Sequence, residues 1–156
     1  AHYRRGRREM EDGDLEAAKE ELSQARRLQP FEGSTRLYLA ETLYRLGDYE
    51  GGRREVRATW HLARGRAVLL FSVGQFSLLD RALADLTVKS FHEASVLEAR
   101  FFPEVMKLEG IPPATLLRIV PDNGHLLRSL SSHLRRLGEP ELAEEALGRS
   151  KLVQAP

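Results

Sequence analysis

The five histidines are the residues whose chemistry would be easiest to recognise, because imidazole serves both as a metal ligand and as a general acid or base. No two of them stand three or four residues apart, the spacing that would place both on one helix face. His92-Glu93 lacks the second histidine of a zinc-protease motif, and the sequence has no cysteine. We therefore predict no metal site at His2, His61, His92, His125 or His133.

Other motifs of catalysis are missing as well. No serine stands in a G-x-S-x-G turn, and neither G-x-x-x-x-G-K-[ST] nor G-x-G-x-x-G occurs as a phosphate-binding loop. The adjacent carboxylates Glu20-Glu21 and Glu144-Glu145 fall in stretches expected to be helical, where a solvated surface is the simpler interpretation. We predict a protein that is not an enzyme and that needs no cofactor.

Arginine clusters raise the question of nucleic-acid binding, since basic stripes can follow a phosphate backbone. The clusters lie at residues 4–8, 26–27 and 53–66. Acidic residues such as Glu9, Glu11, Glu50 and Glu55 interleave with them, and the formal net charge of the chain is only +1. This pattern favours ion pairs along helices. A nucleic-acid role ranks third among the hypotheses below.

Length and composition indicate the elements that position these side chains. The 156 residues are enough for one domain. The 26 Leu and 16 Ala, against 2 Ile and 8 Val, favour helices over strands. The longest apolar run, residues 67–73, is far shorter than the roughly 20 residues that a membrane-spanning helix needs. We expect a single all-α domain over residues 1–156 without a transmembrane segment.

The first part of the chain repeats with a period of 34 residues. This shift aligns Gly13-Asp14 with Gly47-Asp48, and it aligns small residues elsewhere, such as Ala18 with Gly52. Glycine adopts positive φ at little conformational energy and can therefore end one helix, and the aspartate after it can cap the next helix. Pro30 is placed to end the second helix. The spacing predicts two helix–turn–helix units.

This pattern resembles the tetratricopeptide repeat (TPR), a helix–turn–helix unit of 34 residues. The resemblance implies an α-α superhelix of antiparallel helical hairpins, with repeat 1 at residues 1–30 and repeat 2 at residues 31–64. A partial repeat and a C-terminal helix are expected over residues 122–152, where Gly138 and Ala143 take up the same spacing.

Residues 65–121 form an irregular middle section that we interpret as degenerate helical hairpins. Apolar spacing predicts a helix over residues 67–86, with Gly74 as a candidate break and Phe76 and Leu79 on its apolar stripe. A second, looser resemblance covers roughly residues 76–148. It is to the TPR-like segments of bacterial proteins that polymerise or ligate cell-surface polysaccharide.

The TPR resemblance also implies a binding site, because the first helix of each hairpin lines the concave face of such a superhelix. In this family that face usually holds a peptide of a partner protein. The repeat register assigns seven residues to the face: Tyr3, Arg7, Met10, Leu37, Glu41, Tyr44 and Arg45. Arg7 and Glu41 stand where the family's carboxylate clamp would have asparagine, which disfavours a clamp of that kind.

Three functional hypotheses follow. The first is a non-catalytic protein–protein interaction scaffold that binds a partner peptide or domain on the concave face. The second is an accessory soluble domain of a larger membrane-associated bacterial enzyme of cell-surface polysaccharide assembly, and the third is nucleic-acid binding. A homo-oligomer and either a cytoplasmic or a periplasmic location stay open. The chain begins inside the repeat pattern, so we expect it to be a segment of a longer protein.

Overall fold

The computed structural model describes residues 1–154, which fold into α-helices and one short 3-10 helix, with no strand in that range. The chain therefore has the all-α class that its composition predicts. The elements in order are α1 (His2–Glu11), α2 (Leu15–Leu28), α3 (Gly33–Arg45), α4 (Tyr49–Leu62), α5 (Ala67–Leu78), η1 (Arg81–Leu83), α6 (Ala84–Leu97), α7 (Phe101–Met106), α8 (Pro113–Ile119), α9 (Gly124–Arg136) and α10 (Pro140–Gln154).

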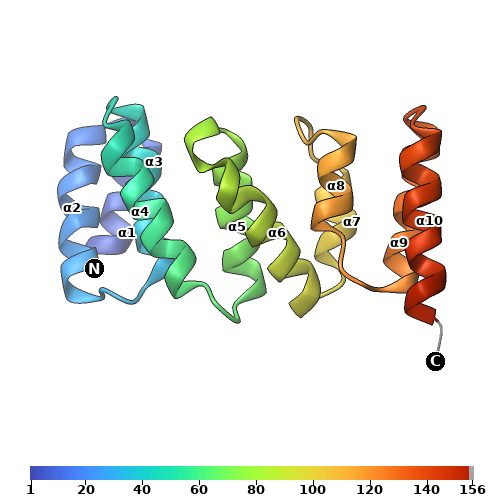
Figure 1. Cartoon of the computed structure of the whole chain (residues 1–156). Helices are drawn as coiled ribbons and strands as arrows, with labels where there is room; N and C mark the ends of the chain where they lie inside the picture. The colour runs from blue at the N-terminus through green and yellow to red at the C-terminus, as the bar shows by residue number, and fades with distance from the viewer. Residues whose placement is uncertain (155–156) are drawn as a thin grey trace.

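Successive helices run up and down and form hairpins that stand side by side in one row (Figure 1). The pairs α1–α2, α3–α4, α5–α6 and α9–α10 pack most extensively. Turns within hairpins lie along one edge of the row, and linkers between hairpins lie along the opposite edge. The fold is an α-α superhelix of antiparallel hairpins, TPR-like in architecture. The division into repeats at residues 30, 64 and 121 stays a prediction.

The turn chemistry of the first two hairpins agrees with the sequence pattern. Gly13 and Gly47 have φ of 85° and 83°, a region in which side chains with a Cβ are strained. The carboxylate of Asp14 accepts a hydrogen bond from the backbone N–H of Ala17, and that of Asp48 accepts one from Gly51. Each aspartate thus satisfies a free donor at the start of the second helix of its hairpin.

The predicted break at Gly74 is wrong. Gly74 lies inside α5, and that helix ends at Leu78; Asp80 then caps η1 by accepting a hydrogen bond from the Ala82 N–H. The glycine serves a close approach instead, since a Cβ placed on it would lie 2.5 Å from the ring of Phe91 in α6. Gly74 therefore allows α5 and α6 to pack tightly, and it does not end the helix.

The irregular middle section has a packing of its own. The two short helices α7 and α8 both contact α6. Their buried side chains, among them Phe102 and Ile119, join the largest apolar cluster, which continues through α9 to α10. No helix among residues 1–154 is both long enough and apolar enough to cross a membrane.

Candidate partner-binding groove

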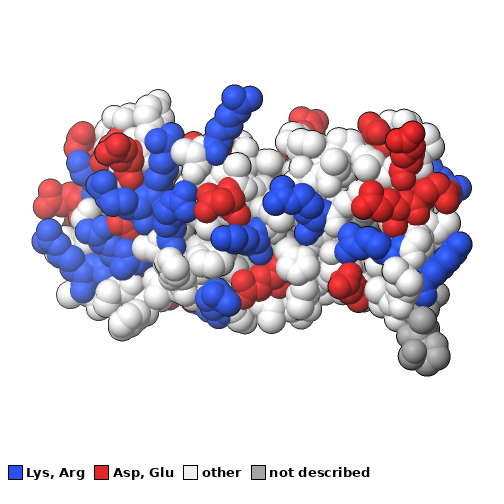
Figure 2. All heavy atoms as spheres, in the orientation of Figure 1, with Lys and Arg blue, Asp and Glu red and all other residues white. Residues whose placement is uncertain are grey.

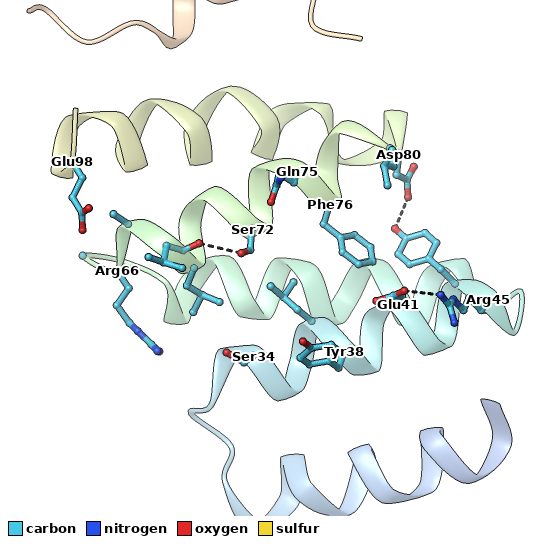
Figure 3. Close-up of a pocket in the computed structure, with 17 residues that line it drawn as sticks. Ser34, Tyr38, Glu41, Arg45, Arg66, Ser72, Gln75, Phe76, Asp80 and Glu98 are labelled. Carbon is cyan, nitrogen blue, oxygen red and sulfur yellow. Dashed lines mark hydrogen bonds and ion pairs between the residues drawn. The ribbon is translucent and has the colours of Figure 1, made fainter. Parts of the chain in front are cut away.

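A groove of about 990 Å³ lies between α3 and α5, the first helices of the second and third hairpins (Figure 3). Its walls combine apolar and aromatic side chains with charges at both ends. The lining residues are Ser34, Leu37, Tyr38, Glu41, Tyr44, Arg45, Gly65, Arg66, Ala67, Val68, Leu69, Ser72, Gln75, Phe76, Leu79, Asp80 and Glu98.

The α5 side of the groove presents apolar surface to solvent. Val68 is 61% exposed and Leu79 is 86% exposed, while Phe76 is half-buried between them. The α5 sequence contains no charged residue, and Ser72 and Gln75 are the polar side chains that this helix places in the groove. Apolar side chains left open along a groove are typical of a binding surface.

Every acidic side chain that lines the groove already has a basic partner. Glu41 pairs with Arg45 at 3.0 Å, Asp80 with Arg53 at 2.8 Å, and Glu98 with Arg100 at 2.6 Å. The exposed Arg66, at the same end as Glu98 in Figure 3, makes no ion pair with any residue from 1 to 154. Between its two ends the groove thus carries no charge, and its lining carboxylates are neutralised in pairs.

A hydrogen-bond network fixes one end of the groove. The Tyr44 hydroxyl donates to Oδ2 of Asp80 at 2.5 Å, and the Arg53 guanidinium donates to both carboxylate oxygens of Asp80, at 2.8 and 3.2 Å. The hydrogen bonds from Arg53 and Tyr44 lower the pKa of Asp80 to about 2. Burial, together with the hydrogen bond to Asp80, raises the pKa of the Tyr44 phenol. Tyr44 is therefore a neutral donor at ordinary pH.

Four of the seven residues named from the sequence line this groove, namely Leu37, Glu41, Tyr44 and Arg45. The other three lie on α1, behind the groove wall. Tyr3 packs edge-on against Tyr38 with ring centroids 5.7 Å apart, and the Arg7 guanidinium lies 4.8 Å from the centroid of the same ring. Met10 is buried, at 6% exposure. Its carbonyl accepts a hydrogen bond from Arg45 at 3.4 Å.

The α5 side of the groove is what sequence reasoning missed. Phe76 and Leu79 carry the apolar spacing of a core helix, and the run that includes Val68 is equally consistent with burial. The distinguishing signal is the lack of any charge over residues 67–78. In a row of hairpins each helix keeps one side open, so a helix without charged residues exposes some of its apolar side chains there.

The fold can be compared with known proteins. The sequence matches no protein-family model and no curated protein. The structure is similar to a crystal structure of MamA, with a TM-score of 0.53 and 14% identity over 96% of this chain and 94% of that one. It is also similar to the MamA RS-1 ArsTM double mutant, with a TM-score of 0.51 and 16% identity over 98% of this chain and 92% of that one. Neither likeness supports the looser resemblance to polysaccharide-assembly proteins. At these identities the likeness concerns the fold alone, and the chain shares with MamA a TPR-like superhelix of helical hairpins.

Proposed function

We propose that the chain is a non-catalytic protein-interaction scaffold and that the groove between α3 and α5 holds a segment of a partner protein. The observation that carries this proposal is the open apolar wall of α5, where Val68 and Leu79 are more than half exposed. Tyr38 and Tyr44 face them from α3, and aromatic side chains are enriched at protein interfaces.

The groove residues predicted from the sequence have different roles in this proposal. Leu37 and Tyr44 supply apolar and aromatic contact with the partner. The paired Glu41 and Arg45 lie at the border of the groove. Tyr3 and Arg7 hold the ring of Tyr38 in place from behind. Met10 acts only through packing and through its carbonyl, because its side chain is buried.

Affinity capture from a lysate of the source organism, with three forms of the protein, tests the proposal. The groove variant Val68→Glu/Leu79→Glu places two charges on the α5 wall, and the control Leu28→Glu/Leu137→Glu alters two leucines elsewhere that are also more than half exposed. Leu37 is a poorer choice because it also packs against two core clusters. We expect a partner that the parent and the control recover and the groove variant loses. Equal recovery by all three forms contradicts the proposal.

A further inference from the structure

The two long edges of the molecule differ in charge. We define the linker edge as residues 1–5, 26–34, 62–69, 96–102, 117–125 and 149–153, which surround the linkers and the chain ends. The turn edge comprises residues 8–16, 44–51, 78–86, 105–113 and 135–143. The linker edge holds ten Arg and Lys against three Asp and Glu, whereas the turn edge holds six against twelve. A chain of net charge +1 is therefore strongly polarised across the row of hairpins.

Helix electrostatics explains only part of this difference, since helices both begin and end at each edge. On the turn edge, Asp14, Asp48 and Asp80 are N-cap residues whose carboxylates accept backbone hydrogen bonds. On the linker edge the N-cap positions of α5 and α7 are Arg66 and Arg100, and neither makes a side-chain cap. A cation at an N-cap does not stabilise its helix, so helix electrostatics does not account for Arg66 and Arg100. It does favour Arg27, Arg118 and Lys151, which lie in the last turns of α2, α8 and α10.

Several cations of the linker edge have no internal partner. Five exposed basic side chains there form no ion pair with any residue in the range 1–154, and they are spread from α1 to α10. They are Arg4, Arg27, Arg66, Arg118 and Lys151. Because they are neither paired nor buried, their charge is available to an external anion.

The same edge carries most of the exposed apolar surface. Of the ten large apolar side chains that are exposed among the described residues, seven lie on the linker edge. They are Leu28, Phe31, Val68, Val96, Leu97, Leu152 and Val153. Phe31 in the α2–α3 linker is 78% exposed, and Leu152 near the end of α10 is 76% exposed. Figure 2 shows the lower rim of the molecule, where Figure 1 places the linkers, as mostly uncharged surface with scattered basic and acidic groups.

We propose that the linker edge docks on the surface of an anionic phospholipid bilayer. Free cations attract acidic headgroups, and apolar side chains set among them can enter the boundary between headgroups and acyl chains. A nucleic acid would use the cations but would leave aliphatic side chains such as Leu28 and Leu152 without a partner. The linkers and the end of α10 follow one side of the row (Figure 1), so many weak contacts can form on a single surface at once. This interaction is peripheral. The linker edge and the groove share the residues at one end of the groove, among them Arg66, Val68 and Glu98.

Co-sedimentation with vesicles tests the proposal, using phosphatidylcholine alone and phosphatidylcholine mixed with phosphatidylglycerol in equal amounts. We expect binding to the mixed vesicles that weakens with added salt, and little binding to the neutral ones. The variant Arg27→Glu/Arg118→Glu/Lys151→Glu should bind the mixed vesicles roughly tenfold more weakly or worse. None of these three residues lines the groove.

A matched control separates the edge from the overall charge. Arg8→Glu/Arg81→Glu/Arg136→Glu makes the same change in net charge with exposed arginines of the turn edge, and it should keep vesicle affinity within about threefold. Circular dichroism of both triple variants shows whether they remain helical. Equal weakening by the two variants overturns the proposal. It is also overturned if the parent does not bind the mixed vesicles. This holds even if the linker edge is then found to bind an acidic polypeptide or single-stranded nucleic acid.

Insertion of the apolar side chains has its own readout. The indole introduced by Phe31→Trp should be quenched by brominated lipid in mixed vesicles. The indole introduced by Leu137→Trp, on the turn edge, should not be quenched. The unaltered protein gives the background from Trp60. Equal quenching of the two introduced indoles, or quenching of neither, contradicts insertion of this edge.

Discussion

The hydroxyl of Tyr44 donates a hydrogen bond of 2.5 Å to Oδ2 of Asp80, a residue 36 positions later in the chain. Tyr44 belongs to α3, whereas Asp80 caps η1 just after α5. Arg53 of α4 binds the same carboxylate, so three consecutive parts of the row meet at one side chain. The contact joins the second hairpin to the third and sets one end of the groove between them.

Removal of the Tyr44 hydroxyl should weaken this junction. Tyr44→Phe keeps the ring, which packs 5.3 Å from that of Phe76, but it removes a hydrogen bond to a charged acceptor. We expect the free energy of unfolding to fall by about 1–2 kcal/mol, measured by urea denaturation. Tyr49→Phe is the control because Tyr49 is more than half exposed. The free energy of unfolding of this variant should differ little from that of the parent. Equal losses in the two variants would show that the hydrogen bond adds nothing.

The same network predicts a dependence of stability on pH. The pKa of Asp80 falls from 3.8 to about 2 in the folded protein. The unfolded chain therefore takes up the proton first as the pH is lowered. The stabilisation from this ionised group is present above about pH 4 and is lost as the pH falls through about 2.

Thermal unfolding of the parent and of Asp80→Asn across this pH range measures the effect. The pKa values of Glu21 and Asp85 are also lowered, but these groups are common to both proteins. Their contribution cancels in the difference between the two curves. We expect the parent to lose stability more steeply than the variant between about pH 4 and pH 2. Parallel curves would contradict this role for Asp80.

The sequence predicts the fold class and the first two hairpins well, because their signals are local. Gly13 and Asp14 determine a turn and a cap through their own backbone and side-chain chemistry. Gly74 shows where local reasoning fails. A glycine in a helical stretch indicates either a break or a close contact, and only the position of Phe91 on the next helix decides which.

The groove could be predicted only in part, for a related reason. The repeat register assigns Leu37, Glu41, Tyr44 and Arg45 to the open face of α3, and these four line the groove. The register also assigns Met10, but its side chain is buried. On α5, apolar spacing alone does not distinguish a side chain covered by the protein from one open to a partner. Leu79, at 86% exposure, follows the same spacing as the fully buried Leu83.

Gly74→Ala should destabilise the protein, although alanine has the higher helix propensity. Its Cβ would lie 2.5 Å from the Phe91 ring. Because that ring is fully buried, it cannot move away without displacing its neighbours. We expect a loss of about 1–3 kcal/mol in the free energy of unfolding. Gly148→Ala in α10 is the control, because nothing lies within 4 Å of its Cβ position, and it should be neutral or stabilising by up to about 1 kcal/mol. Urea denaturation of both variants measures these changes. A higher free energy of unfolding for Gly74→Ala would show that α5 and α6 can separate freely.

Glu55 is the buried charge on which the junction of the first two hairpins depends. It lies on α4 at 6% exposure and forms ion pairs with Arg26 of α2 and Arg36 of α3. Glu55→Ala would leave two partly buried guanidinium groups without this carboxylate. The expected loss is about 2–4 kcal/mol in the free energy of unfolding, reduced somewhat because both arginines still reach water.

Glu144→Ala provides the comparison, since Glu144 pairs with Arg135 on the surface, where both side chains are more than half exposed. A surface pair contributes about 0–1 kcal/mol, so the two substitutions should differ clearly in urea denaturation. The double variant Arg26→Ala/Arg36→Ala adds a second test, because it removes the basic partners and leaves Glu55 buried and unpaired. We expect it to be at least as destabilising as Glu55→Ala. If both variants lost no more than Glu144→Ala, hydrophobic packing at Leu22, Leu39 and Leu43 alone would hold the two hairpins together.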